Sequence, residues 1–490
     1  MITSAVPSTG KRRWRPWKVL LLVLLCLIVL FASYRWWHQK EMDARLEASI
    51  AATDAVDPNW RWADMVREYE KLPASPNFPQ LLLPWRGYRG WNNDDINTRP
   101  GAIDYSPDLS EFFSVRFPAP YFKILKDRLD ESGVTGPTIM REALKQMAQE
   151  PWVCKVPIDG IDLHERIRVA SYYLWDEMEL AAHLGNEEAL VSQLQSQLRL
   201  SRYTQASPKA MHCITSMTAG SKGVEGIKRA MALGKLSSST LMQCQKILET
   251  ENQLDLIQML RKLRADHFEE LEQARNDPDK LQKLKALYQD PNRFDTSTWS
   301  KRAYYWWKCL ELEFAMSSLV EAQADILEIS NETILLAKTN PAAFAGIDPA
   351  KIPPHVQHPI NKTKHIIARQ YAQALFSVAR GALTCQAERS ALIVALACER
   401  YRLVEGCYPK ALTDLVPAYL SSVPIDPFTR NPLLYRTIPV GVVIYSVGRN
   451  GIDDGGDVCH NGNKDRGTKL FHPELRGKKY EDLDPEKKHP

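Results

Sequence analysis

Apolar positions along most of the chain recur every three or four residues, the spacing that puts side chains on one face of an α-helix. The clearest stripe lies at Leu163, Ile167, Ala170, Leu174, Met178 and Ala181. Gly185-Asn186 ends this helix, and a second begins at Glu187, which predicts a helical hairpin. Further helices are expected at 223–233, 238–274, 279–288, 296–336 and 360–405.

The hairpin around 181–190 resembles one unit of a tetratricopeptide repeat. Only one copy is recognisable, whereas about three stacked units are needed to bury a core, so no repeat array is predicted. His267 shares a helical stripe with Leu260, Leu263 and Leu271. Since no second ligand lies at helical spacing, we interpret it as a core or boundary residue.

The first strongly apolar run lies close to the N-terminus. It extends from Val19 to Ala32 between paired tryptophans, and 17–37 is long enough to cross a bilayer core of about 30 Å. Five basic residues precede the apolar run and no acidic residue occurs before Glu41, so the positive-inside rule places residues 1–16 in the cytoplasm and the body outside. We predict a single-pass signal anchor; a cleaved signal peptide is the alternative.

The pattern between the anchor and the C-terminus predicts three parts. Residues 38–72 are helical in pattern and are interpreted as a stalk. Residues 73–120 hold eight prolines and are predicted to be irregular. Residues 121–384 form the expected large α-helical domain.

Composition adds two constraints. The 490 residues are 44% hydrophobic and 25% charged, with a net charge of only +4, so the chain lacks the basic surface of a nucleic-acid-binding protein. Of nine cysteines, Cys26 lies in the anchor. The other eight are suited either to disulfides outside the cytoplasm or to buried free thiols.

The period of the pattern changes to that of strands near the C-terminus. A helix at 390–405 ends at Gly406, and a short helix at 410–416 follows. A proline-punctuated turn at 423–432 then precedes β-rich runs at 433–437 and 440–445, which predict an antiparallel hairpin. The predicted α/β module spans 385–471, and 472–490 form a charged flexible tail.

Three successive segments of this module carry a family resemblance: ERYRLVEGCYPKALTDLVPAYL, VPIDPFTRNPLLYR and VVIYSVGRNGIDDGGD. Their order resembles the C-terminal half of the major pseudopilin of type II secretion systems. The resemblance covers 387–465 and implies a helix, an Asp-Pro turn, a short antiparallel sheet and a calcium loop. That family's N-terminal processing motif is absent, because Thr9-Gly10-Lys11-Arg12 provides neither its aromatic residue nor its glutamate.

The glycine-rich loop after the second strand has the chemistry of a calcium site. Its oxygen-bearing side chains are those of Ser446, Asn450, Asp453, Asp454 and Asp457. Calcium takes six to eight oxygen ligands, and four glycines in this stretch let the backbone turn its carbonyl groups inward. The spacing is not that of an EF-hand, and the alternative is a solvated loop without metal.

Motifs for catalysis are absent from the sequence, which has no HExxH, GxSxG, GxGxxG or GxxxxGK[ST]. His355, His358 and His365 lie in a proline-rich stretch, and Glu269-Glu270 in a charged helix face. The aromatic cluster at 299–307 is expected to pack between helices.

Three functions remain open. The first is a membrane-anchored, extracytoplasmic scaffold or interaction protein of the bacterial inner (cytoplasmic) membrane, with its body in the periplasm. It would bind an unknown protein partner and carry a module that calcium stabilises. The alternatives are an exported enzyme acting on cell-envelope material and a component of a type II secretion-like system.

Overall fold

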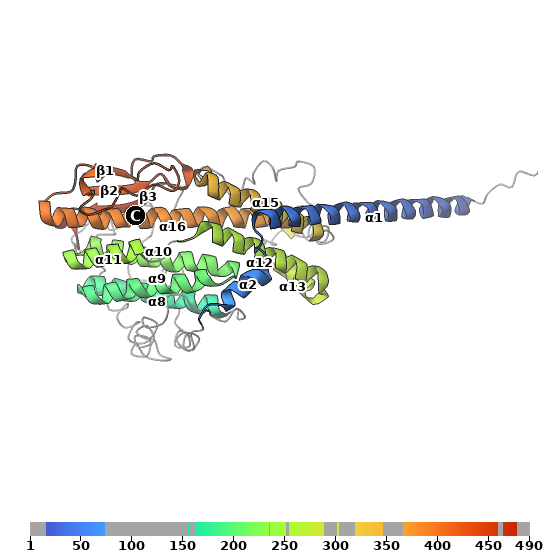
Figure 1. Ribbon diagram of the computed structural model, residues 1–490, viewed down its shortest axis with the longest axis horizontal. Coiled ribbons are helices and arrows are strands. Elements are labelled where there is room, and N and C mark those ends of the chain that lie inside the picture. Colours follow the sequence, from blue (N-terminus) through green and yellow to red (C-terminus); the bar gives the residue numbers. More distant parts are fainter. Residues whose placement is uncertain are drawn as a thin grey trace, which may run out of the picture.

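The expectation of a mainly helical protein with a small C-terminal sheet is confirmed. The computed structural model describes residues 16–73, 155, 162–234, 236–250, 254–288, 301–302, 319–345, 366–458 and 464–477. These residues include ten α-helices and one three-stranded antiparallel sheet (Figure 1).

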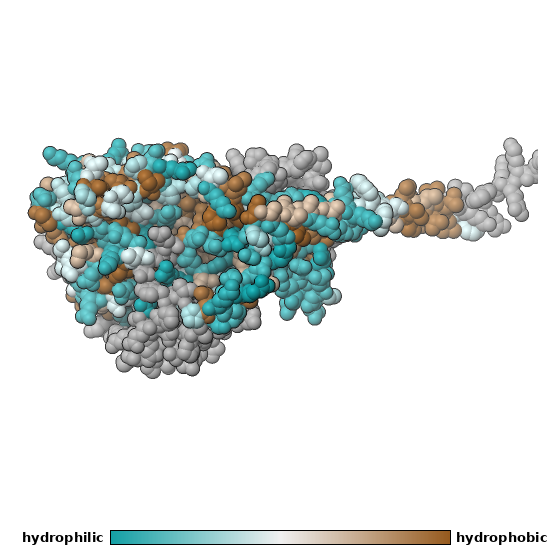
Figure 2. All heavy atoms as spheres, in the orientation of Figure 1, coloured by the Kyte–Doolittle hydropathy of each residue, from teal (hydrophilic) through white to brown (hydrophobic). Residues whose placement is uncertain are grey.

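Helix α1, Pro16–Val56, is a single unbroken helix that projects from one end of the body (Figure 1). Within it, Leu20–Val56 includes a stretch long and apolar enough to cross a membrane. Large side chains from Leu20 to Phe31 are at least half exposed, and Figure 2 shows this apolar part standing clear of the polar body. An exposed apolar surface of this size is typical of a segment that contacts a membrane or another protein.

The C-terminal part of α1 packs on the body instead of forming an isolated stalk. It lies along α15, Leu319–Thr339. The Arg45 guanidinium lies 2.7 Å from the Asp325 carboxylate and 2.6 Å from that of Glu328. Leu46 is buried with Val320 in the same small apolar cluster. The apolar part of α1 therefore continues into the folded body without a break in the helix.

Trp60 completes the attachment of α1, just before α2, Trp62–Glu70. Its ring is 1% exposed and meets Phe268 edge-on at 5.0 Å. Phe268 belongs to α12, Leu256–Asn276, which continues into α13, Pro278–Tyr288. Large buried aromatic surfaces of this kind dominate packing energies, so Trp60 fixes the turn after α1.

The predicted helical hairpin is confirmed as α8, Asp162–Leu184, and α9, Glu187–Ala206. Gly185 adopts a left-handed φ of 69°, and the Asn186 side chain accepts a hydrogen bond from the Ala189 N–H. Helix α10, Ala210–Leu233, packs on both helices. It begins at Ala210, well upstream of the expected start at 223.

The expected helix at 238–274 is two helices: α11, Ser238–Thr250, and α12. The Asp255 side chain caps α12 by accepting from the Gln258 N–H at 3.0 Å. His267 lies at the edge of the core, with its ring centroid 5.0 Å from that of Tyr371 and Nδ1 3.0 Å from the Leu263 carbonyl oxygen. This is the boundary position that its stripe predicts.

Helix α16, Ile366–Glu405, forms the long axis of the molecule (Figure 1). It packs on α10, α11, α12 and α15 and on strands β2 and β3. It runs without interruption across position 385, so a continuous helix joins the helical domain to the C-terminal module. Gly406 follows with a φ of 79°, the left-handed conformation expected at this helix end.

The sheet has the order β1-β2-β3, with β1 at Leu434–Ile438, β2 at Gly441–Ser446 and β3 at Arg466–Phe471. The hairpin of β1 and β2 is confirmed, with Tyr435 opposite Ile444. Every residue of β2 is buried, because it is the central strand and α16 packs on it. The remaining short elements are 3₁₀ turns at Pro341–Phe344, Leu412–Leu415, Gly448–Asn450 and Pro473–Leu475.

Some sequence predictions lie outside the described residues. They concern the Pro-rich segment from 74 to 120, the aromatic cluster at 304–307 with Trp299, the three histidines His355, His358 and His365, and the tail from 478. Cys154, Cys309 and Cys459 also lie outside. The six cysteines that the structure describes are free thiols: Cys26, Cys213, Cys244, Cys385, Cys398 and Cys407.

Candidate functional site

The glycine-rich loop at 446–457, called the acidic loop below, begins where β2 ends. A buried carboxylate fixes its start. Asp426, in the Asp-Pro turn before β1, is 1% exposed. It accepts hydrogen bonds from the Ser446 hydroxyl at 2.7 Å and from the Val447 N–H at 3.2 Å. It also accepts from the Phe428 N–H at 2.8 Å. Asp426 therefore ties the proline-rich turn to the first residues of the loop.

A second carboxylate, that of Asp465 just before β3, closes the far side of the loop. It accepts from the backbone N–H groups of Asp454 at 3.2 Å and Gly456 at 2.8 Å. Burial raises the pKa of Asp465; these N–H groups oppose that rise, and the nearby carboxylates of Asp454 and Asp453 add to it. Asp465 was not among the predicted ligands, because it lies beyond the glycine-rich stretch.

The predicted metal ligands each have a partner within the protein. Ser446 is fully buried against Asp426. The Asn450 amide donates to the Asp454 carboxylate at 2.8 Å. Asp453 accepts from the Tyr445 hydroxyl at 3.0 Å, and Asp457 pairs with Lys464. The structure therefore places the five residues in one short stretch, where Asn450 and Asp454 pair with each other and the other three side chains have partners outside the set.

Four glycines shape this loop as the sequence predicts. Gly448, Gly451, Gly455 and Gly456 have φ values of 66°, 71°, 78° and 84°. Side chains other than hydrogen are strained in this left-handed region. No group of three or more His, Cys, Asp or Glu side chains among the described residues is arranged to hold a metal ion. The calcium site stays a prediction, for which the side chains would have to change partners.

Charged side chains fasten the end of the module to α16. Glu399 is 1% exposed and accepts from Arg476 at 2.7 and 2.8 Å and from Arg402 at 2.7 and 3.0 Å. Arg476 also donates to the Tyr408 hydroxyl at 2.8 Å. Burial alone would raise the pKa of Glu399, but these hydrogen bonds and the two positive charges lower it to about 2. We call these four residues the Glu399 cluster.

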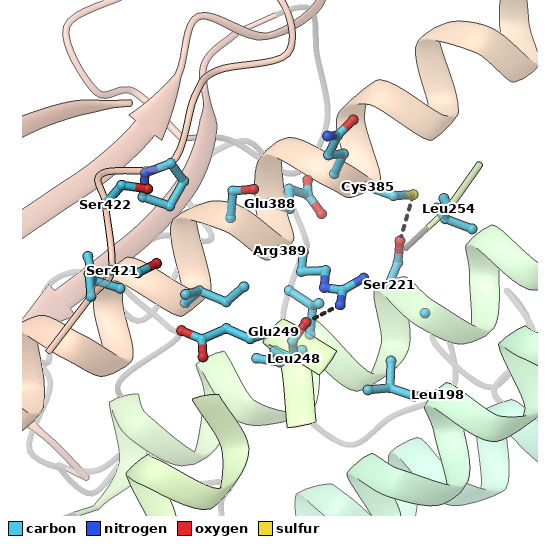
Figure 3. A pocket seen from close by; sticks show the side chains of 17 residues that line it. Leu198, Ser221, Leu248, Glu249, Leu254, Cys385, Glu388, Arg389, Ser421 and Ser422 are labelled. Carbon is cyan, nitrogen blue, oxygen red and sulfur yellow. Dashed lines mark hydrogen bonds between the residues drawn. The ribbon is translucent and has the colours of Figure 1, made fainter. Parts of the chain in front are cut away.

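A cleft of about 480 Å³ lies between the helical body and the module (Figure 3). Helices α9, α10 and α11 form one side, α16 forms its floor, and the segment 420–424 forms the other side. Figure 3 shows Arg389 extending from α16 across the cleft. Its guanidinium donates to the Leu248 carbonyl oxygen near the end of α11.

Two nucleophilic side chains of the cleft, those of Cys385 and Ser221, lie in contact. The Cys385 thiol lies 3.2 Å from the Ser221 hydroxyl, and burial raises its pKa to about 11. It is therefore protonated at neutral pH, and the thiolate is the nucleophilic form. The described lining contains no histidine that would serve as a general base for either group.

Comparison with protein-family models, curated proteins and solved structures found no match. The function of the protein must therefore be inferred from its own residues. The features that bear on it are the exposed apolar part of α1, the cleft, and the acidic loop.

Sequence reasoning missed the residues that the fold brings together from far apart. Glu399 and Arg476 are separated by 77 positions, and Asp57 meets Arg264 across 207. No periodic pattern connects such pairs. One signal could have indicated Glu399: it is a charged residue within an otherwise apolar helical segment, directly after Cys398.

Proposed function

We propose that the protein is a single-pass, membrane-anchored, extracytoplasmic interaction protein or scaffold of the bacterial cytoplasmic membrane. The observation that carries this proposal is the continuity of α1. One helix includes an exposed apolar segment and then packs on α15 through Arg45. A helix of this form holds a folded body at a fixed distance and orientation from a bilayer.

The orientation follows from charge. Lys11, Arg12, Arg13, Arg15 and Lys18 precede the apolar segment, and the positive-inside rule keeps such a cluster in the cytoplasm. Because the body follows the segment, it lies on the opposite side. The described residues that line the cleft include no histidine, and the Cys385 thiol is protonated at neutral pH, which favours a binding function over an enzymatic one.

The C-terminal module is proposed to be pseudopilin-like. The packing of α16 against a short antiparallel sheet, the Asp426 turn and the glycine-rich loop support this proposal. The module follows a large helical domain instead of directly continuing an N-terminal helix. We therefore propose that it serves as a structural unit of this protein and that assembly into a pseudopilus is not its role.

Cross-linking in cells tests the interaction function. Cells expressing a C-terminally tagged chain are treated with an amine-reactive cross-linker that does not cross membranes, and the protein is captured in detergent. We expect discrete cross-linked species that contain a second protein. A matched chain in which a cleavable signal peptide replaces 1–37 should lose them if anchoring positions the body. Capture of the uncross-linked chain alone would contradict the interaction function.

Calcium stabilisation of the module is proposed from the acidic loop. The carboxylates of Asp453, Asp454 and Asp457 are exposed, and the first two raise the pKa of Asp465, so a cation would relieve their repulsion. An ion that binds only the folded state raises the melting temperature by mass action. We expect calcium to raise it relative to a chelator, and the Asp453→Ala/Asp457→Ala double variant to lose the difference. Identical melting curves for the wild-type protein would exclude calcium stabilisation.

A further inference from the structure

The cleft between the helical body and the module has the size of a ligand site. Its volume of about 480 Å³ falls within the range of about 300–1,000 Å³ that ligand pockets occupy. It is built by segments from both halves of the chain, including Ser221 of α10 and Ser421 of the module. Figure 3 shows Ser421 and Ser422 on one side of Arg389, and Leu198 and Leu254 on the other.

The lining excludes several ligand classes. None of its described residues is aromatic, so the cleft offers no surface on which a sugar ring or a nucleobase would stack. Its one guanidinium, that of Arg389, is already engaged by the Leu248 carbonyl group. A phosphate group would need several convergent positive donors, and the cleft does not provide them.

The same lining is complementary to a peptide. Its apolar part consists of six aliphatic side chains: Leu198, Val224, Leu248, Leu254, Ile393 and Leu420. Beside them are the hydroxyl groups of Ser390, Ser421 and Ser422 and the amide of Gln386. Hydroxyl and amide groups both donate and accept hydrogen bonds, as the N–H and C=O groups of a peptide backbone require.

Charge specifies one further feature of the peptide. Glu249 and Glu388 oppose the single positive charge of Arg389, and Glu388 has a partner in Arg466 at 3.7 Å. Glu249 lies in the last turn of α11, which has no basic residue. The carbonyl end of a helix dipole favours cations, so a carboxylate there adds to a negative potential. A positively charged side chain of the ligand would meet this potential.

We propose that the cleft binds an extended peptide segment in which an aliphatic side chain is adjacent to a lysine or arginine. The proposal rests on the interaction function and specifies the chemistry of the partner. The aliphatic side chain fills the apolar part, the basic side chain approaches Glu249, and the serine hydroxyls pair with the peptide backbone.

Fluorescence anisotropy of the full-length protein in detergent micelles tests this proposal. The probe is a dye-labelled peptide of sequence Gly-Leu-Lys-Leu-Gly. We expect saturable binding, weakened about tenfold or more by Ser421→Trp, which fills the cleft from an exposed position. Glu249→Gln removes a charge at the rim of the cleft and should weaken binding about threefold. Thr413→Trp, an exposed site of the same module outside the cleft, is the matched control and should leave binding unchanged.

Two control peptides define the specificity. Replacing the lysine with glutamate should weaken binding by about tenfold, and more so at low salt because screening is weaker there. Replacing both leucines with serine should abolish binding. The proposal is overturned if the probe fails to bind the wild-type protein, or if it binds the Ser421→Trp and Thr413→Trp proteins equally.

The result is separable from that of the interaction function. If cross-linked species persist unchanged in the Ser421→Trp protein and the probe does not bind, the peptide proposal fails while the interaction function stands. If no species are cross-linked although the probe binds the cleft as expected, the interaction function fails and the peptide proposal stands.

Discussion

Glu399→Gln is expected to destabilise the C-terminal module by about 3–5 kcal/mol, because it leaves two guanidinium groups without their carboxylate. The side chain of Arg476 is 3% exposed and that of Arg402 is 14% exposed, so water compensates neither fully. Amide hydrogen exchange measures the effect locally. Protection should fall in β3 and in the following turn at Pro473–Leu475, which Arg476 holds against α16.

The pH dependence provides an independent check on Glu399. Its pKa is lowered from 4.5 to about 2 in the folded protein, which corresponds to about 3 kcal/mol. A lowered folded-state pKa means that the unfolded chain binds the proton more readily. The stabilisation is therefore complete above pH 4.5 and is lost as the pH falls toward 2. The Glu399→Gln protein should show a weaker acid dependence in this window.

Glu405→Gln is the matched control, because Glu405 is an exposed residue of the last turn of the same helix. Its effect should stay within about 0.5 kcal/mol, as is usual for surface substitutions. Equal hydrogen exchange in the two variants would show that the Glu399 cluster does not hold the end of the module.

Asp57→Ala is expected to have a comparable effect at the other end of the molecule, where α1 meets the body. Asp57 accepts from Arg261 at 2.6 and 2.7 Å and pairs with Arg264, whose side chain is 1% exposed. Removing Asp57 leaves the buried Arg264 with Asn331 and the face of Trp60 as its remaining partners, at a cost of about 3–5 kcal/mol.

The readout for Asp57→Ala is the exchange of amide protons at the base of α1. An increase of about a hundredfold is expected at Ser49 and Thr53, which pack against α15, if the loss reaches 3 kcal/mol. Glu68→Ala removes an exposed pair with Lys71 and is the control, with an expected loss below about 0.5 kcal/mol. Unchanged exchange in the Asp57→Ala protein would mean that apolar packing around Leu46 alone holds α1.

The helices could be predicted from the sequence because each buries one face. The stripe through Ile167, Leu174 and Met178 is buried as its spacing predicts, and Asn186 caps the next helix. The first β hairpin was also predictable, since Pro439 separates two β-rich runs. The spacing of apolar residues and the residues that end a helix or strand are local properties of the sequence. The elements that they predict are therefore found in the folded protein.

Strand β3 could not be predicted in this way, because its first two buried side chains, those of Arg466 and Thr468, are polar. Arg466 faces Glu388 of α16, and Thr468 is buried beside it. Lys228 of α10 donates to the Gly467 carbonyl oxygen at 2.8 Å. Arg466 and Lys228 are buried with partners from distant parts of the chain, so the alternation of apolar and polar positions in β3 gave no signal.

The acidic loop also depends on contacts between residues that are far apart in the sequence. Its residues and its left-handed glycines could be read from the sequence, but the roles of Asp426 and Asp465 could not. Both lie outside the loop and reach it through the pairing of three strands. The cleft likewise could not be predicted from the sequence, since its lining comes from five separate stretches of chain.

Thiol labelling of Cys407 tests most directly whether the body lies outside the cytoplasmic membrane. Cys407 is exposed at the end of α16, whereas Cys26 lies in the apolar part of α1. A maleimide that does not cross membranes is added to intact spheroplasts, and the labelled peptide is identified by mass spectrometry, with Cys407→Ser as the control. We expect Cys407 to be labelled without permeabilisation and Cys26 to stay unlabelled. Labelling of Cys407 only after permeabilisation would place the body in the cytoplasm and contradict the proposed function.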